Sequence, residues 1–249
     1  MHDMWRLSPV SSLKPRDLLL VTDFDGTLAE IAPDPTEAHI LPASLAALRH
    51  LAALLRKVAV LSSRPASDLE RLLPLRGIDL IGDSGLVDIT PDERTRLGLF
   101  NVKAAQVLSG FAGVWLEMKP GGTAVHHRKA QVDPSEILAL IKPLLESTHL
   151  KAQPGRRVIE VIPREHPKGD ALAALVQTRR PEGVVCLGDD ENDRPMFAYL
   201  KRSGRPHLTV GVASDEARAD LFAECDLVVS GPEEVSRFLT LVSEWAARP

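Results

Sequence analysis

The stretch DLLLVTDFDGT, residues 17–27, joins an apolar run to a turn rich in aspartate. The run over residues 17–23 is continuous and too short for a typical helix, which is typical of a buried parallel strand. Asp23, Asp25 and Thr27 lie where that strand ends. Because ligands of open parallel sheets bind beyond the carboxyl ends of the strands, this turn is the first candidate for a functional site.

The segments around this stretch alternate between strand and helix patterns. Residues 42–56 place leucines at helical spacing behind a proline, and residues 57–62 form the next apolar run. The same alternation returns after residue 168. The further elements expected are a helix near 65–73, strands at 78–82, 184–188, 208–213 and 226–230, and helices near 169–179, 193–202, 215–222 and from 232. This pattern predicts an α/β fold with a doubly wound, mostly parallel sheet and right-handed crossovers.

The pattern changes between these two blocks. The middle of the chain resembles a half-exposed antiparallel sheet with a helix, with strand candidates at 113–119, 122–128, 149–153 and 156–161 and a helical stretch near 133–147. We therefore expect an inserted α+β cap domain at residues 92–165, between core segments 1–91 and 166–249. The alternative is a long excursion of the main sheet.

Composition and charge exclude several classes of protein. The formal net charge of −4 over 249 residues provides no basic surface large enough to indicate nucleic acid as a partner. No apolar run is long enough to span a bilayer, and the first residues lack the features of a secretory signal, so we expect a soluble cytoplasmic protein without a membrane partner. Cys186 and Cys225 lie in apolar stretches without metal-site spacing, which favours buried reduced thiols.

Polar side chains follow further strands at the same predicted edge of the sheet. They are Ser62, Arg64, Asp189, Asp190 and Asp193, together with Lys168 at the start of a helix. Several carboxylates crowded together repel one another unless a cation lies among them. Because oxygen ligands with few protein carboxylates are what Mg²⁺ prefers, the sequence predicts a magnesium site.

This cluster suits the transfer of a phosphoryl group. A metal shields the negative phosphate from an attacking carboxylate, while Lys168 and the Ser62 hydroxyl can hold other phosphate oxygens. Asp23 can then act as nucleophile and form an aspartyl-phosphate intermediate. Asp25, two residues on, can protonate the leaving alcohol and then deprotonate water.

These residues resemble the motifs of the haloacid dehalogenase superfamily of phosphohydrolases. Asp-Phe-Asp-Gly-Thr at 23–27, Ser62, Lys168 and Gly-Asp-Asp at 188–190 with Asp193 are similar to its four motifs, in order. The resemblance implies a metal bound by the Asp23 side chain, the Asp25 backbone carbonyl and Asp189. It also implies that Asp190 or Asp193 supports that site.

A narrower resemblance covers the whole chain, to the trehalose-6-phosphate phosphatase family. It is carried by TDFDGTLAEIAP at 22–33, LSSRP at 61–65, Glu-Met-Lys at 117–119, His-His-Arg at 126–128 and Glu-Val-Ile-Pro at 160–163. The resemblance implies hydrolysis of trehalose 6-phosphate, with a cap that contacts the sugar. The candidate substrate-binding residues are Thr27, Arg64, Glu117, Lys119, His126, Arg128 and Glu160.

The chain departs from the usual pattern of that family at three positions. Ser63 stands where glycine is common, Ser84 where histidine is common, and His127 where tyrosine is usual. These departures leave the phosphatase chemistry intact and fall near the expected position of the sugar. Sucrose phosphate, a glycosyl-3-phosphoglycerate and other hexose phosphates therefore remain alternative substrates.

Other interpretations use the same residues differently. The acidic turns could cap helices or lie in solvent, and the cap residues could be the polar face of a sheet. A phospho-aspartate signalling module would share the fold, although it does not need the second carboxyl of Asp25. A catalytically inactive sugar-phosphate-binding protein is disfavoured by the intact set of motif residues. A metal site at His126 and His127 is disfavoured because adjacent strand residues point to opposite faces.

Overall fold

The computed structural model describes residues 1–32, 34–86, 89–155, 157–165, 168–214, 219–223 and 225–248. The chain forms two compact units, Met1–Gly85 with Pro167–Pro249, and Leu86–His166. Each unit has a sheet of its own and a hydrophobic core of its own. Within the described ranges, no helix combines the length and the apolar character needed to cross a membrane.

The first unit contains a six-stranded parallel sheet with the strand order β10-β9-β8-β1-β2-β3. Its central strand β1 pairs with β2 on one side and with β8 on the other, so the polar residues that follow these three strands emerge at one edge. The strands are β1 (Leu18–Thr22), β2 (Lys57–Leu61), β3 (Ile78–Ile81), β8 (Gly183–Gly188), β9 (His207–Ala213) and β10 (Leu227–Ser230).

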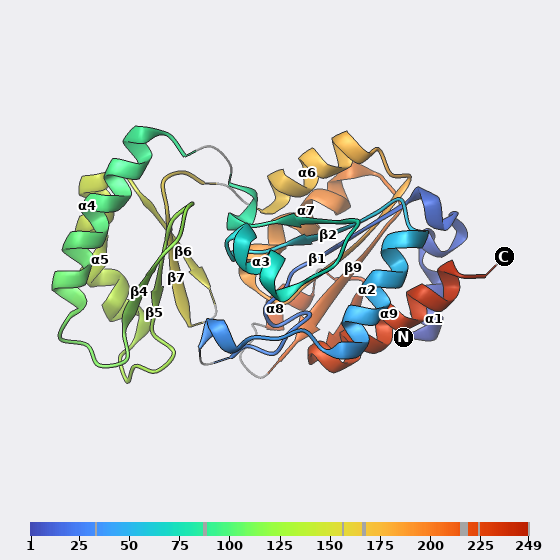
Figure 1. Ribbon diagram of the computed structural model, residues 1–249, viewed down its shortest axis with the longest axis horizontal. Coiled ribbons are helices and arrows are strands. Elements are labelled where there is room, and N and C mark those ends of the chain that lie inside the picture. The colour runs from blue at the N-terminus through green and yellow to red at the C-terminus, as the bar shows by residue number, and fades with distance from the viewer. Residues whose placement is uncertain are drawn as a thin grey trace. The chain divides into compact units, whose positions relative to one another are not determined.

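Helices cover both faces of this sheet, as Figure 1 shows. On one face α6 (Lys168–Arg179) and α7 (Arg194–Ser203) pack through Leu172 and Phe197 onto alternate residues of the strands. On the other face lie α1 (His2–Leu7), α2 (Pro42–Leu54), α3 (Ala66–Leu72) and α9 (Gly231–Ala246). The short helix α8 (Ala219–Phe222) and the 3-10 turns η1 (Pro9–Ser12), η2 (Pro15–Asp17), η3 (Pro35–Glu37), η4 (Asp83–Gly85) and η5 (Glu191–Asp193) complete the unit.

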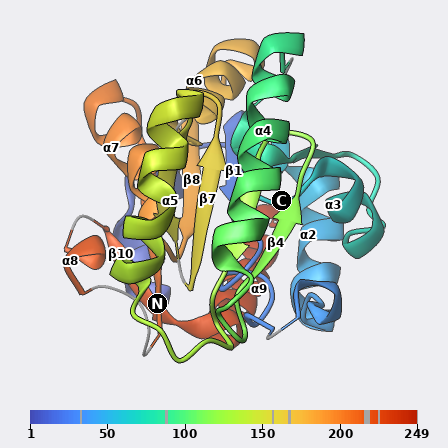
Figure 2. The same ribbon diagram turned by 90° about the vertical axis from the view of Figure 1, so that its left-hand side faces the viewer.

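The second unit is a four-stranded antiparallel sheet in the order β4-β5-β7-β6, with two helices packed on one face. Figure 2 shows α4 and α5 lying side by side. Pro154 is tolerated in β6 because that strand lies at the sheet edge. The elements are α4 (Pro91–Leu108), β4 (Trp115–Met118), β5 (Thr123–His126), α5 (Pro134–Thr148), β6 (Lys151–Gly155) and β7 (Val158–Ile162).

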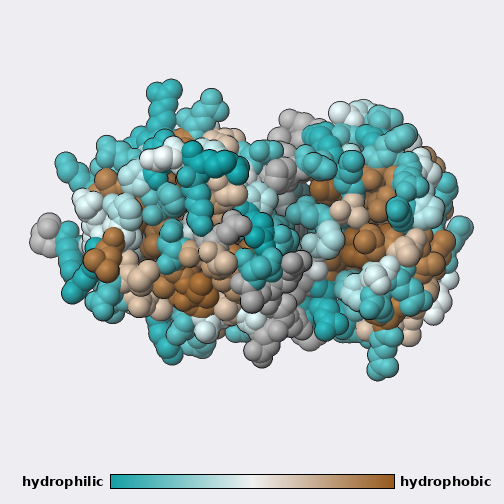
Figure 3. Space-filling view, turned by 180° about the vertical axis from the view of Figure 1, so that it is seen from behind, coloured by the Kyte–Doolittle hydropathy of each residue, from teal (hydrophilic) through white to brown (hydrophobic). Residues whose placement is uncertain are grey.

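The surface of the molecule is mixed in polarity. On the face drawn in Figure 3, hydrophilic side chains predominate and apolar ones are interspersed among them. Large apolar residues that are exposed include Met4, Leu99, Val102 and Trp115. Scattered exposed apolar residues of this kind are normal for folded proteins.

The predicted fold class is confirmed, with local differences. Helix α4 was not among the predicted elements, although Thr90 and Glu93 form a capping box at its start. Strands β6 and β7 begin two residues later than the predicted segments 149–153 and 156–161. The expected helix at 215–222 falls partly on residues 215–218, which lie outside the described residues.

Candidate active site

The turn after β1 is a tight structure that leaves no room for a side chain at Gly26. The Phe24 carbonyl accepts hydrogen bonds from the amides of Leu28 and Ala29 at 2.8 and 3.0 Å. Gly26 has a φ of +74°, and a Cβ atom there would lie 2.0 Å from Asp189 Oδ2. The turn therefore needs glycine, and the Asp189 carboxylate lies directly against its backbone.

A buried charge network forms the centre of the site. Lys168 Nζ lies 2.9 Å from Asp23 Oδ1 and 2.7 Å from Asp193 Oδ1, and the lysine side chain is only 1% exposed. Burial raises the pKa of Asp23 from 3.8 to about 7, although the charge of Lys168 acts in the opposite direction. Burial also opposes the charge of Lys168, but Asp193 and Asp23 together raise the pKa of Lys168 above its ordinary value. Lys168 is thus a permanent cation facing two carboxylates.

Asp193 also organises the turn after β8. Its Oδ2 accepts hydrogen bonds from the backbone amides of Asp189 and Asp190 at 2.9 and 3.1 Å. Asp190 Oδ1 accepts a 2.7 Å hydrogen bond from the amide of Glu191 and caps η5. The side chains of the two neighbouring aspartates therefore have different surroundings. Asp189 lies beside the turn after β1, and Asp190 lies at the start of η5.

The carboxylates of Asp23, Asp189 and Asp193 are suited to holding a metal ion. One oxygen from each lies within 4.8 Å of the others, and all three residues are buried. Three carboxylates and the one ammonium of Lys168 leave two net negative charges in this group. An all-oxygen, acidic donor set of this kind fits a hard divalent cation.

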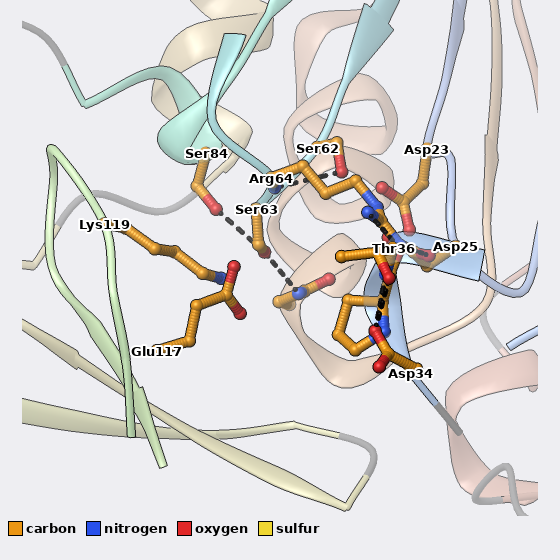
Figure 4. A network of polar contacts seen from close by, with 12 residues as sticks. Asp23, Asp25, Asp34, Thr36, Ser62, Ser63, Arg64, Ser84, Glu117 and Lys119 are labelled. Atoms are coloured by element: carbon orange, nitrogen blue, oxygen red, sulfur yellow. Dashed lines mark hydrogen bonds and ion pairs between the residues drawn. The ribbon is translucent and has the colours of Figure 1, made fainter. Parts of the chain in front are cut away.

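Arg64 binds both carboxylate oxygens of Asp25. Its Nε and Nη2 donate to the two Asp25 oxygens at 2.7 and 2.8 Å, and its Nη1 donates to the Pro35 carbonyl at 2.8 Å (Figure 4). The guanidinium carbon lies 5.4 Å from the centre of the Phe24 ring, so the ring supports the ion pair from below. Asp25 is thus positioned by a bidentate ion pair two residues from Asp23.

The hydroxyl residues predicted for the site are both buried. Ser62 is at the end of β2, and its Oγ accepts a 3.2 Å hydrogen bond from the Arg64 amide, which leaves its own proton to be donated. Thr27 is completely buried, and its Oγ1 has no hydrogen-bond partner among the described residues. Ser62 can therefore donate to a ligand at the strand ends.

The second unit gathers another polar set on its sheet. His126 Nε2 lies 2.7 Å from Glu117 Oε2, and Lys119 Nζ lies 2.8 Å from Glu160 Oε1. Because side chains alternate along strands, Glu117, His126 and Glu160 lie on the face opposite the two helices. Arg128 follows β5 and is half-buried.

Trp115 is a residue of this set that sequence reasoning missed. Its ring stacks on the His126 ring with centroids 4.0 Å apart and planes 11° apart, and the residue is 40% exposed. The signal was present, because Trp115 precedes Glu117 and Lys119 at intervals of two residues. His127 is instead buried, and burial lowers its pKa, so it stays neutral.

Comparison with known proteins identifies the family. A family model described as trehalose-phosphatase matches residues 21–224. The chain belongs to the trehalose-phosphatase family. Among its relatives, the trehalose-phosphate phosphatase of Mycobacterium tuberculosis (strain ATCC 25618 / H37Rv) is 32% identical, over 93% of this chain and 63% of that protein. The trehalose-6-phosphate phosphatase of Escherichia coli (strain K12) is 31% identical, over 78% of each chain.

Solved structures of two phosphatases share the fold. The C-terminal domain of trehalose-6-phosphate phosphatase from C. albicans has a TM-score of 0.75 at 20% identity, covering 98% of this chain and 95% of that one. Sucrose-phosphatase from Synechocystis, in complex with sucrose and phosphate, has a TM-score of 0.56 at 18% identity, covering 92% and 98%. These likenesses show that the chain shares its fold with both proteins. The chain spans less than two thirds of the length of the mycobacterial relatives, from 59% to 63%.

Proposed function

We propose that the protein is a phosphoric monoester hydrolase that converts trehalose 6-phosphate to trehalose and phosphate through an aspartyl-phosphate at Asp23, with Mg²⁺ as cofactor. The observation that carries the proposal is the buried arrangement of Asp23, Lys168, Asp189 and Asp193 at one sheet edge. Membership of the trehalose-phosphatase family supports the substrate. The relatives named trehalose-6-phosphate phosphatase support it further.

In the first step, an oxygen of Asp23 attacks phosphorus and the bond from phosphorus to the sugar oxygen breaks. Asp25 gives its proton to that leaving oxygen, so the sugar departs as a neutral alcohol. Since both Asp25 oxygens accept from Arg64, the carboxyl must exchange at least one of these bonds for one to the leaving oxygen. Arg64 thus sets the resting position of the acid.

In the second step, Asp25 takes a proton from water, the water oxygen attacks phosphorus, and the bond to Asp23 breaks to release phosphate. Lys168 and the Ser62 hydroxyl hold phosphoryl oxygens during both steps. Mg²⁺ bound by the carboxylates of Asp23, Asp189 and Asp193 would shield the charge of the phosphate from the attacking carboxylate.

We assign recognition of the sugar to the second unit, as a cap domain, and the chemistry to the first. Support comes from the paired polar side chains on the sheet of the second unit, Glu117 with His126 and Lys119 with Glu160. Carboxylates and amines of this kind can exchange hydrogen bonds with sugar hydroxyls. Arg128 and the core residues Thr27 and Arg64 complete the proposed substrate-binding set. The partner is therefore a small-molecule sugar phosphate.

We also propose that the enzyme acts in the cytoplasm. Cys186 forms no disulfide among the described residues, and burial raises the pKa of its thiol well above its ordinary value. A protonated buried thiol without a disulfide suits a reducing compartment.

The test is phosphate release by purified protein with Mg²⁺. Trehalose 6-phosphate is compared with sucrose 6-phosphate, glucose 6-phosphate and glucosyl-3-phosphoglycerate, and Asp23→Asn serves as the blank. We expect selective release from trehalose 6-phosphate that is abolished in the variant. Selective release from another sugar phosphate would keep the mechanism and replace the substrate, whereas no release from any of them would favour a signalling or binding role.

A further inference from the structure

Three polar side chains form a bridge across three loops of the first unit. Asn192 Nδ2 donates a 3.2 Å hydrogen bond to Ser63 Oγ, and Ser63 Oγ lies 3.2 Å from Ser84 Oγ. Figure 4 shows Ser63 directed toward Ser84. Ser63 follows β2, Ser84 lies in η4 after β3, and Asn192 lies in η5 after β8. We call these three residues the serine–asparagine bridge.

The loop that carries Ser84 has a strained backbone. Asp83 and Ser84 have φ angles of 50° and 56°, a left-handed conformation that is costly for residues other than glycine. Two hydrogen bonds of 2.8 Å hold this loop, from the Asp83 amide to the Arg64 carbonyl and from the Ser84 amide to the Ser62 carbonyl. Strain of this kind persists where the surrounding structure over-determines a conformation, and it gathers at functional sites.

Two residues of the bridge, Ser63 at its centre and Asn192 at one end, are next to residues of the proposed chemistry. Ser63 lies between Ser62, whose hydroxyl can donate to phosphate, and Arg64, which holds Asp25. Asn192 immediately precedes Asp193, which is completely buried and bound to Lys168. A shift of Ser63 relative to Asn192 would therefore move the Ser62 hydroxyl relative to the fixed pair of Asp193 and Lys168.

We propose that the serine–asparagine bridge is a positioning network, which keeps the Ser62 hydroxyl aligned with Lys168 on the transferring phosphoryl group. The inference rests on the proposed function and names residues outside its catalytic set. Ser63, Ser84 and Asn192 act through Ser62, so losing the bridge weakens contacts to the transition state more than to the bound substrate. The bridge therefore affects kcat more than KM.

The experiment is a double-mutant cycle with Ser63→Ala, Asn192→Ala and the double variant, measured as kcat and KM on trehalose 6-phosphate. The free energy of one hydrogen bond corresponds to a change of about two- to tenfold in a rate constant. We therefore expect each single variant to lower kcat by about two- to tenfold with KM nearly unchanged. Because both changes remove the same bond, the double variant should be no slower than the slower single variant. Ser63→Thr keeps a hydroxyl and should restore most of the kcat.

Ser203→Ala is the matched control. It removes a serine hydroxyl that donates to the Leu200 carbonyl at 2.7 Å, near the end of α7, and it should leave kcat unchanged. Ser84→Ala tests the bridge from its other side, and melting temperatures show whether each variant is folded. A purely structural role would lower the melting temperature and leave the kcat of the folded variants unchanged, which would overturn the proposal.

Further outcomes distinguish a failure of the positioning role from a failure of the proposed function. If the wild type hydrolyses no sugar phosphate but does hydrolyse p-nitrophenyl phosphate, the substrate is wrong and the cycle is measured on that ester. If the effects of Ser63→Ala and Asn192→Ala on kcat are additive on either substrate, the positioning role of the bridge is overturned. It is also overturned if neither variant lowers kcat. Absence of turnover on every phosphate ester would overturn both.

Discussion

Removing the charge of Asp23 should stabilise the protein when metal is absent. In the metal-free protein, burial raises the pKa of Asp23 from 3.8 to about 7, so the folded state binds this proton more tightly than the unfolded chain does. This difference in pKa corresponds to a loss of about 4 kcal/mol in the free energy of unfolding when Asp23 is charged. The loss of unfolding free energy is small below pH 4, because Asp23 is then protonated in both states. It grows as the pH rises from about 4 to about 7 and is fully present above about pH 7.

Asp23→Asn replaces the carboxylate with a neutral group of the same shape. We expect it to raise the free energy of unfolding by at most about 4 kcal/mol at pH 8, and by less than about 1 kcal/mol at pH 4. The assay is urea unfolding in the presence of EDTA at both pH values, with the exposed Asp3→Asn as control. A gain that is equal at both pH values, or a loss at pH 8, would refute the argument that burial of this charge costs stability.

Three further predictions concern other parts of the chain. Asp25→Asn should lower kcat on trehalose 6-phosphate by about 100- to 10 000-fold, and by much less on p-nitrophenyl phosphate, whose leaving group needs no proton. Gly26→Ala should weaken Mg²⁺ binding more than tenfold by calorimetry, because its Cβ would lie 2.0 Å from Asp189 Oδ2; unchanged affinity would exclude that contact. Hydrogen bonds from the Thr90 backbone and Arg164 lower the pKa of Glu93 from 4.5 to about 2, so Glu93→Gln should cost about 1 kcal/mol at pH 7 in urea unfolding. The loss of stability in Glu93→Gln should disappear as the pH falls from about 4.5 to about 2. A loss that does not depend on pH would contradict the argument that these hydrogen bonds stabilise the charged form of Glu93.

The predictable part of the site follows from the topology of a parallel sheet. Asp23, Ser62 and Asp189 each follow a buried apolar strand, and strands of one parallel sheet end at one edge. Local sequence therefore predicted both the strands and the side of the sheet at which the polar residues meet. Helix α4 could have been predicted in the same way, from its capping box and from Leu97, Phe100, Ala104 and Leu108 at helical spacing.

The rest depends on pairings between residues far apart in the chain. Ser63 meets Asn192 across 129 positions, and neither residue carries a local signal for that contact. Ser84 adopts a left-handed backbone that its own sequence disfavours, because hydrogen bonds to the loop after β2 hold it there. Sequence motifs could thus name the candidate residues of the proposed reaction, but not the bridge between their loops.

The charge balance of the site explains how Asp23, the proposed nucleophile, can be buried so deeply. Lys168 alone cannot balance Asp23, Asp189 and Asp193. Burial raises the pKa of Asp23, and the charge of Asp193 adds to that effect. Arg64 is not the missing cation, because both Asp25 oxygens accept from it. A divalent cation would bring the three carboxylates and Lys168 to neutrality and favour the charged, nucleophilic form of Asp23. Removing that cation should therefore lower the charged fraction of Asp23 near and below pH 7 and also remove the shield for phosphate. The proposed activity and the metal-dependent stability thus depend on the same carboxylate.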